Sequence, residues 1–114
     1  MVLRRMVNTE TTTPEVDVAE TARHWTERSA QLVDVREPKE WNDGHIPGAI
    51  HIPLGDLAER ANELIKDSPV ITVCRSGHRS LAAADELIAQ GFADVASLNG
   101  GMLAWAKAGH PIES

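Results

Sequence analysis

The chain has 114 residues, of which 42% are hydrophobic and 25% are charged, and its formal net charge is -6. A chain of this size forms one domain around one core. Its acidic balance argues against a general nucleic-acid binder, which needs a basic face for phosphate contacts. The single cysteine excludes an internal disulfide. No apolar run approaches the roughly 20 residues that span a bilayer, and no apolar region follows the N-terminal arginines as in a signal peptide. We therefore expect a cytoplasmic protein whose partners include neither nucleic acid nor membrane.

The first part of the chain predicts a flexible N-terminal arm over residues 1–13, which are polar and rich in threonine, followed by one domain over residues 14–114. Asp17 and Glu20 have the spacing of a helix start, with Asp17 as the N-cap. This helix places Ala22 and Trp25 on one face and ends near Arg28. Short β-branched or apolar runs then predict strands at residues 31–35, 49–52, 70–73 and 95–98.

Helical periods separate these predicted strands. The first covers residues 54–65 and has apolar residues at Leu54, Leu57, Ala61, Leu64 and Ile65. The second covers residues 80–90 and ends at Gly91, with an apolar face of Leu81, Ala84, Leu87 and Ile88. The last carries Met102 and Trp105 and ends at Gly109. Because strands alternate with helices, we expect an α/β fold with a parallel sheet covered on both faces. The continuous apolar run at residues 70–73 is expected to be its central strand.

Cys74 follows this central strand directly, at the edge of the sheet where ligands of α/β proteins gather. The next residues, 75–79, can fold back so that their backbone N–H groups point at the sulfur. Gly77 permits the tight curl that this needs. The positive end of the following helix adds to the effect, and such surroundings lower the pKa of a thiol. We expect Cys74 to be a nucleophile, with Arg75, Arg79 and His78 holding an anionic substrate.

A simpler interpretation of Cys74 has to be weighed against this one. A lone buried cysteine at the end of a strand is more often an inert, small apolar residue. Inert packing, however, has no use for a Cys-x-x-Gly-x-Arg-Ser loop with a helix behind it. The loop therefore favours the nucleophile.

Three segments of the chain resemble the single-domain rhodanese family, the thiosulfate sulfurtransferase-like proteins. They are LVDVREPKEW with GHIPGA (residues 32–41 and 44–49), CRSGHRS (residues 74–80), and GGMLAW with AGHP (residues 100–105 and 108–111). The resemblance implies a five-stranded parallel sheet flanked by helices on both faces. It also implies that the Cys74 thiolate takes a sulfane sulfur from a small anionic donor such as thiosulfate. The resulting persulfide passes its sulfur to a thiophilic acceptor, cyanide in assays or a thiol in cells, without a metal or an organic cofactor.

The resemblance also assigns roles to individual residues. Cys74 is the catalytic residue, and the substrate-binding residues are Arg36, Arg75, Ser76, Gly77, His78, Arg79 and Ser80. For Arg36 two roles stay open, contact with the donor anion or a structural salt bridge, for example with Glu40. Asp34, Trp41 and His45 are expected to brace loops, and Trp25 and Trp105 to pack on the core. His51 and His110 are expected to be surface or hydrogen-bonded loop histidines.

Other functions of the same fold remain to be separated. A phosphatase or arsenate reductase carries a Cys-x5-Arg loop, whereas only four residues separate Cys74 from Arg79. The chain also has no obvious general acid in the loop. A non-catalytic binding module typically lacks the cysteine or the loop arginine, and this chain has both. A sulfur-relay or sulfur-carrier protein that acts on a protein acceptor would use Cys74 in the same way, and this alternative stays open.

Overall fold

The structure is a computed structural model that describes Leu3 and residues 13–114. Most of the predicted N-terminal arm therefore lies outside the described residues. Leu3 and Thr13 are both buried. The Leu3 N–H donates to Asp94 Oδ2 over 2.8 Å, and the Thr13 hydroxyl donates to Asp85 Oδ1 over 2.8 Å.

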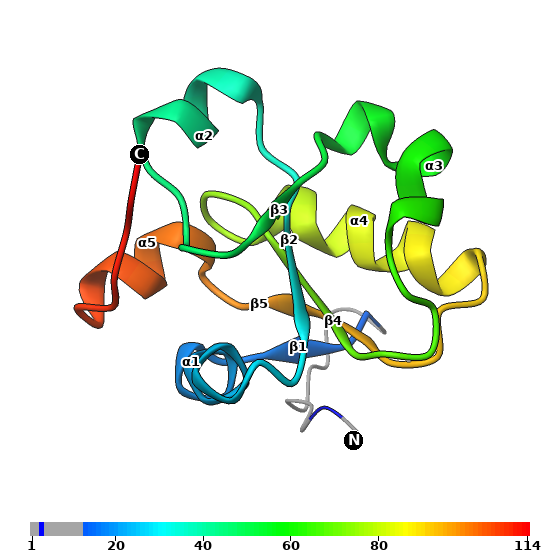
Figure 1. Cartoon of the computed structure of the whole chain (residues 1–114), viewed down its shortest axis with the longest axis horizontal. Coiled ribbons are helices and arrows are strands. Elements are labelled where there is room, and N and C mark those ends of the chain that lie inside the picture. The colour runs from blue at the N-terminus through cyan, green and yellow to red at the C-terminus, as the bar shows by residue number, and fades with distance from the viewer. Residues whose placement is uncertain (1–2, 4–12) are drawn as a thin grey trace.

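Strands and helices alternate along the described chain (Figure 1). The strands are β1 (Glu15–Val16), β2 (Gln31–Asp34), β3 (Ile50–His51), β4 (Val70–Val73) and β5 (Val95–Leu98). The helices are α1 (Val18–Glu27), α2 (Pro38–Asp43), α3 (Leu57–Arg60), α4 (His78–Ala89) and α5 (Gly101–Lys107). Two short 3-10 turns, η1 (Leu54–Asp56) and η2 (Ala61–Glu63), flank α3.

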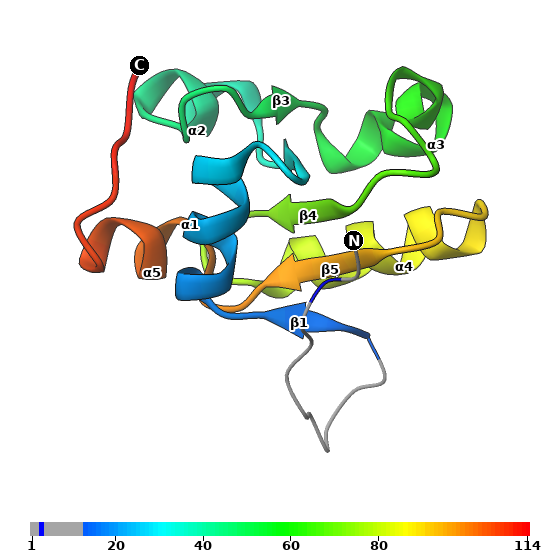
Figure 2. The ribbon, with the colours of Figure 1, turned by 60° about the horizontal axis from the view of Figure 1, so that its bottom comes forward.

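The strands form one parallel sheet in the order β1-β5-β4-β2-β3, which confirms the predicted α/β fold with five parallel strands. Figure 2 shows β1, β5 and β4 side by side. The apolar strand β4 occupies the centre, as its sequence predicts, because an inner strand of a parallel sheet has helices on both faces. Its carboxyl end, and the residue that follows, therefore lie in the middle of one edge of the sheet.

Side chains that alternate along the strands pack into two cores, one on each face of the sheet. On β4, Val70 belongs to the core covered by α3 and α4, which contains Leu57, Ala84 and Leu87. Ile71, the next residue, belongs to the other core, with Trp105 of α5. This two-residue period is what a strand between two helical layers requires.

Several predicted element boundaries differ from the structure. Strand β1 was not predicted, because two residues are too few to show a period. Helix α2 was not predicted either, although Glu37 and Glu40 form a capping box around Pro38, a typical helix start. Helix α4 begins at His78, two residues earlier than predicted.

Two predicted apolar faces are only partly buried. Ile65 and Ile88 were placed on helix faces directed at the core, but both are exposed. The segment from residue 54 to residue 63 is a short α-helix between two 3-10 turns, so a regular helical period does not hold over it. The predicted N-cap Asp17 is confirmed, since its side chain accepts from Glu20 N–H over 2.8 Å.

Candidate active site

Cys74 lies directly after β4, and its side chain is fully buried. The Gly77 N–H donates to the sulfur over 3.1 Å, so the loop folds back onto Cys74 as predicted. The Cys74 thiol donates to the Ser80 hydroxyl oxygen over 3.4 Å. When the sulfur has lost its proton, the direction of this bond reverses, because the hydroxyl can then donate. The surroundings therefore offer hydrogen bonds to both forms of the thiol.

Opposing effects set the pKa of the Cys74 thiol. Burial raises this pKa, because desolvation disfavours the charged form. Hydrogen bonds from the Ser80 hydroxyl and from the backbone N–H groups of Ser80, Gly77 and Ser76 lower it. The hydrogen bonds prevail, and the pKa lies below its ordinary value. The arrangement thus favours a thiolate, the reactive form of a cysteine.

A second layer of buried polar groups holds Ser80 in place. The Ser80 and Ser97 hydroxyl oxygens lie 2.7 Å apart, which links Cys74 through Ser80 of α4 to β5. The Thr72 hydroxyl donates to the Ser80 carbonyl oxygen over 2.7 Å. The side chains of Thr72, Ser80 and Ser97 are all buried. Sequence reasoning missed Ser97 and Thr72, because nothing in the sequence connects them to Cys74.

The start of α5 fixes the other side of the loop. The backbone N–H of Met102 donates to the Cys74 carbonyl oxygen over 2.8 Å, and that of Leu103 donates to the Arg75 carbonyl oxygen over 3.1 Å. Gly101 permits this close approach. A Cβ atom there would overlap the Cys74 carbonyl oxygen and lie 2.6 Å from the Arg75 carbonyl oxygen. Gly101 of the two-glycine segment is therefore a packing requirement of the Cys74 loop.

Arg79 is bound to a carboxylate of α2. Its guanidinium donates to the two oxygens of Glu40 over 2.6 and 2.9 Å. This bidentate bond holds the pKa of Glu40 down at about 2. The pair joins α4 to α2 across the loop. The sequence suggested Glu40 only as a partner of Arg36. Direct contact of Arg79 with the substrate stays a prediction.

Arg36 is buried in a salt bridge, one of the two roles left open for it. Its partner is Asp34, not Glu40: Arg36 Nη2 lies 2.8 Å from Asp34 Oδ2, and Nε donates to Oδ1 over 2.9 Å. Nη2 also donates to the Gly44 carbonyl oxygen over 2.7 Å. Asp34 thus braces the segment before α2, as predicted. Contact of Arg36 with a donor anion stays a prediction.

The remaining predicted loop residues lie at the surface. Arg75, Ser76 and His78 are exposed. The Ser76 hydroxyl lies 3.3 Å from His78 Nδ1. Within residues 13–114 and Leu3, Arg75 has no ion-pair partner. The structure therefore brings Gly77 and Ser80 to the Cys74 sulfur and leaves Arg75 exposed, and contact of Arg75 with a substrate stays a prediction.

Aromatic contacts brace the loops next to α2. The Trp41 ring stacks on His45 at 3.5 Å between centroids and on His51 at 4.7 Å. His45 Nδ1 donates to the Trp41 carbonyl oxygen, and His51 Nε2 donates to the Arg36 carbonyl oxygen, both over 2.8 Å. These contacts agree with bracing roles for Trp41 and His45 and with a hydrogen-bonded loop position for His51.

The other two tryptophans pack as predicted. The rings of Trp25 and Trp105 meet edge to face at 5.6 Å. Trp105 is fully buried and donates to the Pro111 carbonyl oxygen over 2.7 Å, while its ring contacts His110. These contacts join α1 and α5 on one face of the sheet.

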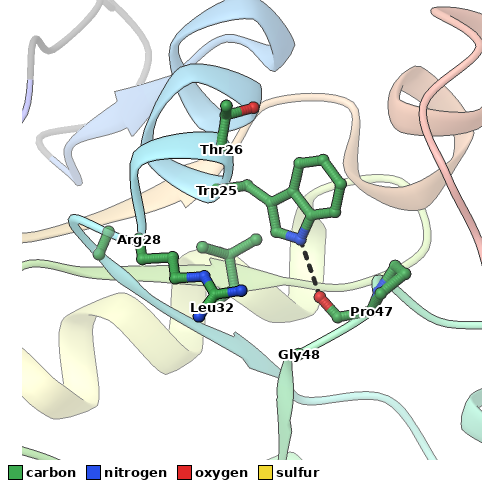
Figure 3. Close-up of a pocket in the computed structure, with 7 residues that line it drawn as sticks. Trp25, Thr26, Arg28, Leu32, Pro47 and Gly48 are labelled. Atoms are coloured by element: carbon green, nitrogen blue, oxygen red, sulfur yellow. Dashed lines mark hydrogen bonds between the residues drawn. The ribbon is translucent and has the colours of Figure 1, made fainter.

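A hollow of about 710 Å³ lies away from Cys74. It is lined by Trp25, Arg28, Leu32 and Pro47, among others, and contains no residue of the nucleophile loop. Figure 3 shows the Trp25 indole N–H directed at the Pro47 carbonyl oxygen, a hydrogen bond of 2.8 Å. Leu32 pairs with Ile71, three positions before Cys74 on the neighbouring strand. The hollow therefore has no direct part in the chemistry of the sulfur.

The described part of the chain has neither a metal-binding cluster nor a membrane-spanning helix. Among Leu3 and residues 13–114, no group of three or more His, Cys, Asp or Glu side chains could hold a metal ion. None of the helices described is both long enough and apolar enough to cross a membrane.

Comparison with known proteins places the chain in a family. The family described as "Rhodanese-like domain" matches residues 17–108. The chain is 40% identical over 86 residues to the thiosulfate sulfurtransferase GlpE of Pseudomonas syringae pv. syringae, covering 75% of this chain and 81% of GlpE. It is 43% identical over 79 residues to the "Putative sulfur carrier protein YrkF" of Bacillus subtilis, covering 69% of this chain. This match spans only 43% of the length of YrkF.

A solved structure agrees with this assignment. The rhodanese-related protein of Thermoplasma volcanium superimposes with a TM-score of 0.80 at 29% sequence identity, covering 87% of this chain and 96% of that protein. The family match over residues 17–108 contains strands β2 to β5, the Cys74 loop and α5. The chain therefore belongs to the rhodanese-like domain family and has homologues that are sulfurtransferases.

Proposed function

We propose that the protein is a thiosulfate sulfurtransferase that works through a persulfide on Cys74. The observation that carries the proposal is the ring of donors around the buried sulfur. It includes the Gly77 N–H at 3.1 Å and the Ser80 hydroxyl at 3.4 Å. Donors that stabilise a thiolate also stabilise a persulfide anion, by the reasoning that applies to an oxyanion hole.

The reaction proceeds in two displacements. In the first, the Cys74 thiolate attacks the outer sulfur of thiosulfate. A sulfur–sulfur bond to Cys74 forms as the bond within thiosulfate breaks, and sulfite leaves with the electron pair. In the second, cyanide or a thiolate attacks the outer sulfur of the persulfide, and Cys74 leaves as a thiolate. Neither step needs an oxidant, a reductant or a cofactor. Because Cys74 has to be a free thiol, a reducing compartment suits this chemistry, and we place the protein in the cytoplasm.

A sulfur-carrier function is the second candidate, and the similarity to YrkF favours it. In that case the acceptor is a protein, and Cys74 works in the same way. The contacts of Arg79 argue against a phosphatase, because its guanidinium is bound to both oxygens of Glu40. A phosphatase would need that charge for the oxygens of its substrate.

Intact mass spectrometry tests the proposed function. The purified protein is exposed to thiosulfate, freed of the donor, and then treated with cyanide. We expect a gain of one sulfur atom that cyanide reverses and that the Cys74→Ser variant does not show. A Cys74→Ser variant that still gains and loses the sulfur would refute the role of Cys74. Hydrolysis of a phosphate ester without any sulfur gain would favour the phosphatase instead.

A further inference from the structure

A groove of about 350 Å³ lies next to the Cys74 loop, between α2 and α5. We call it the α2–α5 groove. Its lining includes Asp43, Arg75, Met102, Leu103, Ala106 and Ile112. The first turn of α5 is hydrogen-bonded to the carbonyl oxygens of Cys74 and Arg75. The groove therefore starts one residue away from the nucleophile.

The C-terminal segment closes the groove on one side. Figure 1 shows this segment running from α5 to α2. His45 and Glu113 exchange backbone hydrogen bonds of 2.8 and 2.9 Å, which anchor the segment. Ile112 packs so closely on Gly44 that a Cβ atom there would lie 2.9 Å from Ile112 Cγ2. The position of Ile112 is thus fixed, and the groove is preformed.

Apolar side chains are exposed in the α2–α5 groove. Leu103 is 49% exposed and Ile112 is 46% exposed, and the two line the same hollow. Isolated exposed apolar residues are common, but two of them together in a concave site indicate contact with an apolar ligand. Thiosulfate and cyanide have no apolar part, so neither of them accounts for these residues.

The charged residues of the groove predict the order of charged groups along a complementary ligand. Arg36 and Glu40 also line it, but both are bound in ion pairs. Within the described residues, Arg75 and Asp43 have no ion-pair partner. A free cation therefore lies beside the nucleophile, and a free anion lies on α2. A complementary ligand has an acid near its reacting sulfur, an apolar group beyond it, and a base farther along.

We propose that the α2–α5 groove binds the peptide segment around the reactive cysteine of a protein sulfur acceptor. This inference rests on the proposed function and names the class of acceptor. The acceptor places an acidic residue against Arg75 and an apolar side chain against Leu103 and Ile112. Its cysteine thiolate attacks the outer sulfur of the Cys74 persulfide. The new sulfur–sulfur bond forms on the acceptor, and the electron pair of the broken bond returns to Cys74 as a thiolate.

A peptide probe tests this docking. Cys74 is loaded with sulfur from thiosulfate, the donor is removed, and sulfur loss to the peptide acetyl-Gly-Cys-Glu-Leu-Lys-amide is followed by intact mass. A second peptide has Ser in place of Leu. Partial burial of one leucine side chain in this open groove, less than the value for full burial, predicts about a 5- to 10-fold preference for the Leu peptide in kcat/KM. Cyanide serves as the acceptor that does not use the groove.

The variants make the test specific. Leu103→Ser is expected to abolish the preference for the Leu peptide and to leave discharge to cyanide unchanged. The matched control is Ile88→Ser. Ile88 is 42% exposed in the last turn of α4 and does not line the groove, so this variant should keep the preference. Ile112→Ser repeats the test from the other wall. Arg75→Glu should favour a peptide with Lys in place of Glu.

The outcomes separate this inference from the proposed function. If Cys74 takes up no sulfur from thiosulfate, the proposed function fails first. If Cys74 loads and cyanide discharges it, but Leu103→Ser and Ile112→Ser keep the full preference, the docking proposal is wrong. An equal loss of discharge to dithiothreitol and to the Leu peptide in Leu103→Ser would also overturn it, because dithiothreitol is too small to use the apolar wall.

Discussion

Removal of the Ser80 hydroxyl should make the Cys74 thiolate less stable. Ser80→Ala deletes the donor 3.4 Å from the sulfur and changes the side-chain volume little. The backbone N–H of Gly77 and the start of α4 remain. The variant therefore isolates one hydrogen bond to the thiolate, and the expected result is a higher pKa of the Cys74 thiol.

The expected size follows from the strength of such a bond. A hydrogen bond to a charged group contributes about 1.5–3 kcal/mol, and 1.36 kcal/mol corresponds to a tenfold change in a protonation equilibrium. Because a distance of 3.4 Å is long even for a bond to sulfur, we take the lower end of this range. The acid dissociation constant of the Cys74 thiol should fall about tenfold in Ser80→Ala, and at pH values below the thiol pKa sulfur uptake from thiosulfate should slow by a similar factor.

Two measurements check the prediction. The pH dependence of the ultraviolet thiolate absorbance gives the thiol pKa, and intact mass gives the rate of sulfur uptake. Ser97→Ala is the matched control, because Ser97 contacts the Ser80 hydroxyl at 2.7 Å and acts on the sulfur only through Ser80. It should raise the thiol pKa by less than Ser80→Ala does. An unchanged pKa and uptake rate in Ser80→Ala would refute this account of the site.

The remaining predictions concern the contacts that hold the loop. Glu40 has a folded-state pKa of about 2 against an ordinary 4.5, so its ion pair with Arg79 stabilises the fold above pH 4.5 and is lost as the pH falls toward 2. Because the pair is about a third exposed, we expect only about 1 kcal/mol, measured as the difference in urea-unfolding free energy between wild type and Glu40→Gln across this window. A difference that is independent of pH would contradict it. Gly101→Ala should lower the unfolding free energy by at least about 2 kcal/mol, because both a positive φ and contact with the loop carbonyls oppose a side chain. Gly109→Ala, where φ is also positive but nothing lies within 4 Å, should cost only about 1 kcal/mol, and equal losses would show that the contact is unimportant.

The place of Cys74 in the sheet could be predicted from the amino-acid sequence alone, and its role as a nucleophile stays a prediction. The apolar run at residues 70–73 can be satisfied only between two helical layers, so it had to be the central strand. Cys74 then had to lie at the carboxyl edge, in front of a helix start. Gly77 made the folded-back loop predictable, because a tight turn needs a residue that tolerates a positive φ.

The long-range partners of the residues around Cys74 become visible only in the tertiary structure. The partner of Arg79 is Glu40, 39 residues away, and the partner of Ser80 is Ser97 on another strand. Local spacing predicts contacts within a helix or a turn, whereas these pairs depend on how α2 and β5 pack against the loop. Arg36 illustrates the limit: the sequence suggested Glu40 as its salt-bridge partner, whereas in the structure Nε and Nη2 of Arg36 both donate to the Asp34 carboxylate. Long-range pairs of this kind depend on the packing of whole elements, which a single sequence does not reveal.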